Sequence, residues 1–141
     1  MIGRMMLLGT LVLAAAPIVA LGTTPAPAKH ESPFACSPSA LTPAERKKHF
    51  EVDSPKLRTV LQEIRELPDG YEFRFASSPD TYRTLSEWVY QERLCCPFFD
   101  LNLRIGREGG PLWLRLTGRE GVKSFITEEF APWFSVTKGR S

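Results

Sequence analysis

The sequence has no strong excess of charge of either sign. Its 18 lysines and arginines stand against 16 aspartates and glutamates, and the formal net charge is +2. The basic residues are also scattered along the chain and form no stripe. Because nucleic-acid binding depends on concentrated positive charge, we expect no nucleic-acid partner.

Several common catalytic motifs are also missing. The sequence has no glycine-rich phosphate-binding loop, no His-Glu-x-x-His and no Gly-x-Ser-x-Gly. It has no Cys-x-x-Cys either, so a thioredoxin-like mechanism lacks its motif. The two histidines offer little more: His30 lies in a polar segment, and His49 follows the charged run Arg46-Lys47-Lys48, which predicts a surface position.

The N-terminus has the features of a secretory signal peptide. Arg4 precedes an uncharged apolar run over residues 5–22, and small residues follow, with Ala26 and Ala28 in an Ala-x-Ala pattern. We predict a signal peptide over residues 1–28 and an exported protein, periplasmic or extracellular. The alternative is an uncleaved membrane anchor, for which the run is barely long enough. Removing residues 1–28 would leave 17 basic and 16 acidic residues.

Export affects what the three cysteines can do. Outside the cytoplasm thiols tend to pair, and three cysteines cannot all pair within one chain. One of Cys36, Cys95 and Cys96 is therefore reactive, bound to a metal, joined to another molecule, or simply buried.

The rest of the chain divides into a tether, one domain and a tail. Residues 29–40 are rich in Pro, Ala and Ser and predict a flexible tether with Cys36 near its end. The length suits a single domain, which we assign to residues 41–134. Residues 135–141 are expected to be a disordered tail.

The domain's pattern predicts helix, hairpin, helix, hairpin, helix. A capped helix starts at Thr42-Pro43 and ends near residues 50–52, and a strand begins near Thr59. The other elements follow from turns and periodicity: a strand over residues 71–75, a helix from Ser78 to the Cys-Cys pair, strands over 99–105 and 112–116, and a helix over 122–130 that Pro132 ends. We predict an α+β fold: a small two-layer sandwich with a four-stranded antiparallel sheet, built from two hairpin–helix units with helices on one face.

The candidate site lies where the second helix must stop. Glu92 is three residues before Cys95 and four before Cys96, so on a helix all three side chains point to one sector. Pro97 disfavours helix at Cys96 and ends it there. A carboxylate on an apolar stripe needs a partner: a cation, a backbone amide, or a basic residue, which could be Arg104, Arg115 or another one.

The adjacent cysteines allow three interpretations. One cysteine pairs with Cys36 and the other is a small buried residue. Alternatively both bind a thiophilic ion, aided by Cys36, His49 or Glu92, and zinc would take four ligands from this set. In the third, one thiol is a redox or nucleophilic centre, although the negative end of the helix dipole should raise its pKa. A Cys95–His49 dyad is conceivable, but the spacing does not require it.

These residues resemble a family of short, uncharacterised bacterial proteins. The shared pattern covers most of the expected domain: Cys36 ahead of Leu41-Thr42-Pro43-Ala44-Glu45-Arg46, then Leu67-Pro68-Asp69-Gly70-Tyr71, then Glu92-Arg93 with Cys95-Cys96-Pro97-Phe98, and finally Leu116-Thr117-Gly118 with Glu120-Gly121-Val122-Lys123. Members often have proline where this chain has Arg119. The resemblance supports the fold and marks the same junction, but it implies no activity.

The leading functional hypothesis is a thiol-based binding protein for a soft metal or metalloid ion, zinc or another thiophilic ion, with Glu92, Cys95, Cys96 and Cys36 as ligands. The alternative is a non-catalytic exported interaction module with a structural disulfide, whose sheet binds another protein. An enzyme with a cysteine nucleophile comes third. Binding predicts that Cys95 and Cys96 are reduced and converge with Glu92. The module predicts Cys36 within disulfide reach of one of them, and the enzyme predicts a base beside the thiol.

Overall fold

A computed structural model describes residues 31–138. The expected signal peptide, residues 1–28, lies outside the described residues, as do the start of the expected tether and residues 139–141. Within residues 31–138, no helix is both long and apolar enough to cross a membrane. The helices are η1 (Pro38–Ala40), α1 (Pro43–Lys47), η2 (Lys48–Asp53), α2 (Ser54–Val60), α3 (Pro79–Cys95), η3 (Arg107–Gly109), α4 (Val122–Glu129) and α5 (Ala131–Lys138).

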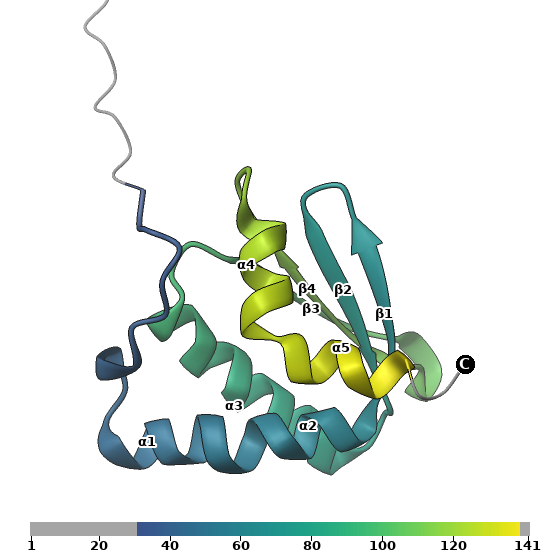
Figure 1. Cartoon of the computed structure of the whole chain (residues 1–141). Coiled ribbons are helices and arrows are strands. Elements are labelled where there is room, and N and C mark those ends of the chain that lie inside the picture. The colour runs from purple at the N-terminus through teal and green to yellow at the C-terminus, as the bar shows by residue number, and fades with distance from the viewer. Residues whose placement is uncertain (1–30, 139–141) are drawn as a thin grey trace, which may run out of the picture.

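Two hairpins form one antiparallel sheet of four strands. The strands are β1 (Leu61–Leu67), β2 (Gly70–Phe75), β3 (Asp100–Ile105) and β4 (Leu112–Thr117), in the spatial order β1-β2-β4-β3. Strands β2 and β4 join the hairpins, with Phe73 opposite Leu114. Helix α3 follows the first hairpin and α4 the second, so the predicted α+β fold is confirmed (Figure 1).

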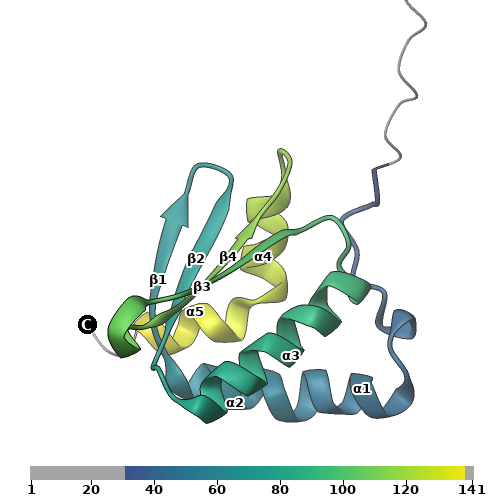
Figure 2. The same cartoon turned by 180° about the vertical axis from the view of Figure 1, so that it is seen from behind.

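The helices pack against one face of the sheet. Phe73 and Leu114 are fully buried on that face, and Phe73 contacts the ring of Trp133 at 5.7 Å. Figure 2, seen from behind, shows β3 and β4 in front of α4. On the opposite face, charged side chains lie over the ring of Trp113. The guanidinium groups of Arg65 and Arg104 are 4.3 Å and 5.5 Å from its centre. This alternation of apolar and polar side chains is the period-2 pattern that predicted the strands.

The first helical region is longer than the sequence suggested. Its start is as predicted, since the Thr42 side chain accepts from the Glu45 N–H and the Glu45 carboxylate accepts from the Thr42 N–H. The expected end near residues 50–52 is wrong: helix continues through the π-helical η2 into α2 as far as Val60. The wider π turn accommodates Pro55, whose missing N–H would break a regular helix. Strand β1 therefore begins at Leu61 instead of near Thr59.

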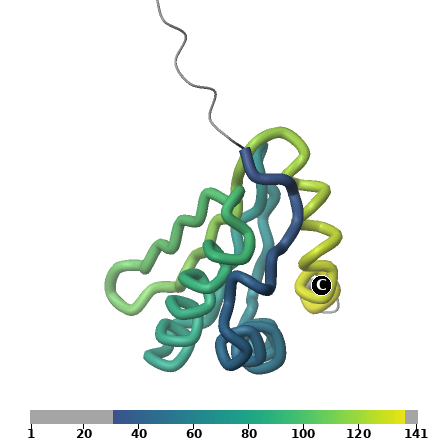
Figure 3. The backbone as a smooth tube through the Cα atoms, turned by 90° about the vertical axis from the view of Figure 1, so that its left-hand side faces the viewer, coloured from purple at the N-terminus to yellow at the C-terminus, as the bar shows by residue number. Residues whose placement is uncertain are grey.

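Residues 31–40 lie against the domain, although their composition predicted a flexible tether. Phe34 packs edge-on to Phe98 at 5.2 Å and stacks on Phe125 of α4 at 6.3 Å. Arg119 donates to the backbone carbonyl of Ser32 at 2.6 Å. Figure 3 shows this segment, in dark blue, running past the helices. Composition alone missed this packing because it depends on contacts with residues distant in the sequence.

The C-terminal helix also extends past the expected domain boundary at residue 134. Pro132 does end the preceding helix, but it stands in the first turn of α5, where its missing N–H costs nothing. Trp133 is 4% exposed and contacts Phe75 and Phe130. Residues 131–138 are thus helical, and the expected tail at 135–141 is helical over its described part.

Candidate functional site

The end of α3 positions three of the predicted site residues. Ser78 caps the start of the helix, since its side chain accepts from the Thr81 N–H, and the helix ends where Pro97 prevents continuation. Glu92 and Cys95 lie on its inner side and are 2% and 0% exposed. Cys96, the residue after the helix, is also fully buried. The predicted spacing therefore brings all three residues into the core.

A disulfide joins Cys36 to Cys96. The two residues are 60 positions apart in the chain, and their Cα atoms lie 4.9 Å from each other. Next to the bond, the Ser37 N–H donates to the Cys95 carbonyl at 2.8 Å. Cys95 is the one free cysteine. This is the pairing that the structural interpretation required, and it means that Cys96 is not reduced in this state.

His49 is buried beside Glu92, so its predicted surface position is wrong. Its Nε2 lies 2.9 Å from Glu92 Oε2, and the ring is 1% exposed. The ring stacks on Trp88 at 5.1 Å with an interplanar angle of 16°. His49 lies in the π-helical turn η2. The wider turn shifts the helical phase, so His49 points inward although its neighbours in the sequence are charged.

Neither Arg104 nor Arg115 is the partner of Glu92. Arg115 donates to Glu72 at 2.8 Å, and Arg104 lies over Trp113; both are on the opposite face of the sheet. With Glu92 ionised, Nε2 of His49 is the donor of its hydrogen bond. The basic residue that pairs with Glu92 is thus His49 and neither of the two named arginines.

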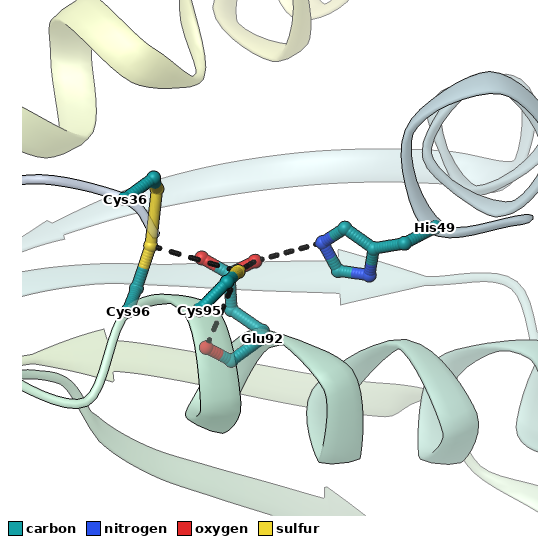
Figure 4. Close-up of a disulfide and its surroundings, with 5 residues drawn as sticks. All are labelled: Cys36, His49, Glu92, Cys95 and Cys96. Carbon is teal, nitrogen blue, oxygen red and sulfur yellow. Dashed lines mark hydrogen bonds and ion pairs between the residues drawn. A yellow bond between two sulfur atoms is a disulfide. The ribbon is translucent and has the colours of Figure 1, made fainter. Parts of the chain in front are cut away.

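The Cys95 thiol lies between the carboxylate and the disulfide. Its sulfur is 3.6 Å from Glu92 Oε2 and 3.9 Å from the Cys96 sulfur. Figure 4 shows this sulfur and the Glu92 carboxylate between the disulfide on one side and His49 on the other. Burial raises the pKa of the Cys95 thiol to about 12, and the negative charge of Glu92 adds to the shift.

This arrangement disfavours a reactive thiolate at Cys95. The suggested Cys95–His49 dyad is not formed, because Nε2 of His49 is bonded to the carboxylate, which itself faces the thiol. A nucleophilic cysteine needs a lowered pKa and an adjacent base. Cys95 has a raised pKa and an adjacent anion.

The predicted ligand set does converge in space. One ligand atom each from Cys36, Glu92, Cys95 and Cys96 lies within 4.8 Å of the others. Two polar atoms at this site, Glu92 Oε1 and His49 Nδ1, are buried without a hydrogen-bond partner among the described residues. Leaving such atoms unpaired costs free energy, so each could accept a further cation or donor.

A cavity of about 210 Å³ adjoins the cluster, with Cys36, His49 and Glu92 in its lining. Sequence reasoning missed both this cavity and the role of His49. The available signal for His49 was indirect: an unpartnered Glu92 on an apolar stripe required a donor, and the chain has only two histidines.

Comparison of the chain with protein-family models, curated proteins and solved structures finds no match. The resemblance based on the Cys-Cys-Pro-Phe segment therefore stays a prediction.

Proposed function

We propose that this is an exported protein that binds a soft metal or metalloid ion through Cys36, Glu92, Cys95 and Cys96 when its disulfide is reduced. The carrying observation is the convergence of these four residues, whose ligand atoms lie within 4.8 Å of one another. Thiolates are the ligands that thiophilic ions prefer, and zinc is typically bound by four ligands. A disulfide and the signal-like residues 1–28 both favour an exported protein.

The spacing of the ligand atoms suits tetrahedral coordination. Zinc–sulfur bonds of about 2.3 Å set two ligating sulfurs about 3.8 Å apart, and a sulfur and a carboxylate oxygen about 3.5 Å apart. The corresponding distances from Cys95 Sγ are 3.9 Å to Cys96 Sγ and 3.6 Å to Glu92 Oε2. Two edges of the tetrahedron thus exist before any ion enters.

His49 acts in this proposal as a positioning residue, not as a ligand. Its Nε2–H donates to Glu92 at 2.9 Å, and its ring is held by Trp88. A donor to a ligating carboxylate fixes the orientation of that ligand, and removing such a donor typically lowers metal affinity by about 10- to 100-fold. The bond is made to Oε2, the same oxygen that lies 3.6 Å from Cys95 Sγ, while Oε1 is unpaired among the described residues.

The disulfide makes ion binding dependent on the redox state. Cys36 and Cys96 are covalently joined in the oxidised chain, so two of the four ligands are unavailable as thiolates. Only Cys95 and Glu92 remain, and two ligands are too few for a structural zinc site. We therefore expect tight binding by the reduced chain and weak binding by the oxidised chain.

The test is a titration of the reduced protein with Cd²⁺ or Zn²⁺ under anaerobic conditions, with a phosphine as reductant. Thiolate–metal charge-transfer absorption follows Cd²⁺ binding, and intact mass under native conditions gives the stoichiometry. We expect one ion per chain and protection of three thiols from alkylation. Cys95→Ala, which leaves the disulfide cysteines in place, should lower affinity at least tenfold, and so should Glu92→Gln.

Glu87→Gln is the matched control, since Glu87 lies on the same helix but is exposed and pairs with Lys48. It should bind the ion as the unmodified protein does. The proposal fails if the reduced, folded chain takes up no ion, or if Cys95→Ala binds as tightly as the unmodified protein.

The second candidate function is a non-catalytic exported module that binds another protein. The observation in its favour is the Cys36–Cys96 disulfide, which fastens residues 31–40 to the end of α3. In that case the disulfide serves stability alone. The reduced chain would then gain no affinity for a soft ion, whereas the ion-binding function requires that it does.

A further inference from the structure

The cavity beside the thiol cluster is larger than an ion requires. It measures about 210 Å³, and both Cys36 and Glu92 line it. It extends from these residues past His49 to the junction where α4 ends and α5 begins. A ligand bound by the cluster through Cys36 and Glu92 would therefore have open space beside it.

Aromatic side chains form much of the cavity wall. Trp88, Phe130 and Trp133 are 1%, 5% and 4% exposed, whereas Phe50 is 37% exposed. The three buried rings hold each other in place, with centres 5.4 Å apart for Trp88–Trp133 and 5.6 Å for Phe130–Trp133. Such fixed walls favour a flat apolar group, and an apolar cavity of about 150 Å³ is known to hold benzene.

The charged residues of the lining do not favour an ionic organic group. Besides Glu92, which is paired with His49, the cavity is lined by Arg58 and Glu129, which carry opposite charges. Because their fields oppose each other, neither an anion nor a cation gains a strong advantage on entering. An uncharged ligand with one apolar part suits this lining better.

Resting on the proposed ion-binding function, we infer that the natural ligand class is a soft metal or metalloid centre carrying one organic substituent. The thiols hold the centre, and the aromatic cavity holds the substituent. Trivalent arsenic with a single aryl group is the simplest member of this class, because its oxide is uncharged and its trivalent centre bonds to two thiols.

The chemistry requires no redox step once the disulfide is reduced. A phosphine and one water molecule first convert the Cys36–Cys96 disulfide into two thiols, and the phosphine becomes its oxide. An aryl arsenoxide then reacts with two thiols, Cys36 among them. Two sulfur–arsenic bonds form, the arsenic–oxygen bond is lost, and the two thiol protons leave with that oxygen as water. Arsenic stays trivalent.

The experiment compares phenylarsine oxide with arsenite on the phosphine-reduced chain. Each affinity is measured by competition against a small dithiol, which has no cavity and so corrects for the intrinsic affinity of each arsenical for thiols. We expect the protein, relative to the dithiol, to prefer the phenyl compound at least tenfold. Binding should also change the fluorescence of the tryptophans, two of which line the cavity.

Phe50→Ala tests whether the cavity provides this preference. Phe50 is the most exposed of the aromatic wall residues, so its removal should leave the fold intact. The preference should fall at least threefold while arsenite affinity stays unchanged. Tyr90→Ala is the matched control, because Tyr90 is 56% exposed on α3 and does not line the cavity.

The outcomes separate this inference from the function on which it rests. Equal preference for the two arsenicals after the dithiol correction overturns the inference, and so does a preference that Phe50→Ala leaves unchanged. In both cases arsenite or Cd²⁺ binding would still support the ion-binding function. Binding of no arsenical and no Cd²⁺ would overturn both.

Discussion

Reduction of the Cys36–Cys96 disulfide should destabilise the protein by several kcal/mol without unfolding its sheet. The bond connects residue 36, outside the sheet and helix layer, to the end of α3. Breaking it leaves the core contacts of Phe73 and Leu114 untouched. The main effect is therefore on the unfolded chain, which gains the freedom that the crosslink had removed.

The size of the effect follows from the length of the loop that the bond closes. The bonded residues are separated by 60 positions. In the chain-entropy treatment, closing a loop of this length stabilises the folded state by about 4 kcal/mol at 25 °C. Since small domains are stable by only about 5–15 kcal/mol, this is a large share of the total.

Urea unfolding of the oxidised and phosphine-reduced chain, followed by tryptophan fluorescence, measures this difference. Intact mass must show a gain of two hydrogens on reduction. Cys36→Ala should reproduce the loss and make stability insensitive to the reductant. Cys95→Ala retains the disulfide, so it should lower the free energy of unfolding by only about 1 kcal/mol. Reduction should then destabilise this variant as much as it destabilises the unmodified protein.

If reduction is verified by the two-hydrogen gain but lowers the free energy of unfolding by less than about 1 kcal/mol, the reasoning is refuted. The crosslink would then constrain the unfolded chain very little. A Cys95→Ala variant that no longer responds to reductant would also refute it. That result would mean that Cys95, and not Cys96, forms the bond.

Two further predictions concern the buried thiol and the sheet. Because the folded-state pKa of Cys95 is raised to about 12 from an ordinary value near 9, its contribution to stability is complete below pH 9 and is lost as pH rises towards 12. Between pH 9 and pH 10, the free energy of unfolding measured in urea should therefore fall by about 1 kcal/mol more in the unmodified protein than in Cys95→Ala. Equal losses in the two proteins would contradict the burial of the Cys95 thiol. Gly70→Ala should destabilise the fold by about 2–4 kcal/mol, since a Cβ there would overlap the Leu116 carbonyl oxygen of β4, and a thermal unfolding curve unchanged from the parent would contradict the β2–β4 register.

The sheet could be predicted from sequence because its signals are local. Alternating apolar residues after the turn at Pro68-Asp69-Gly70 indicated β2, and the same alternation indicated β3 and β4. The end of α3 was equally local, since Pro97 sets it. The extent of α2 was not, because Pro55 usually marks a helix start, and only the π turn before it lets the helix continue.

The site was predictable in its members but not in its contacts. The spacing of Glu92, Cys95 and Cys96 on one helix placed them together, whereas the choice of Cys96 as the partner of Cys36 depends on which sulfur faces residues 31–40. His49 was missed because its burial depends on the helical phase of η2 and on stacking against Trp88, 39 positions away in the sequence. Both are tertiary effects that periodicity does not contain.

The anchoring of residues 31–40 links the disulfide to the proposed ion site. Contacts independent of the sulfurs also hold this segment: Phe34 packs on Phe98 and Phe125, Arg119 donates to the Ser32 carbonyl, and the Ser37 N–H donates to the Cys95 carbonyl. After reduction these contacts keep Cys36 close to Cys95 and Cys96, because the segment loses one of several attachments. A thiol kept nearby has a high effective concentration, which favours both closure of an ion site and re-formation of the bond. The same geometry can thus support an oxidised, crosslinked state and a reduced, ion-binding state without rearrangement of the fold.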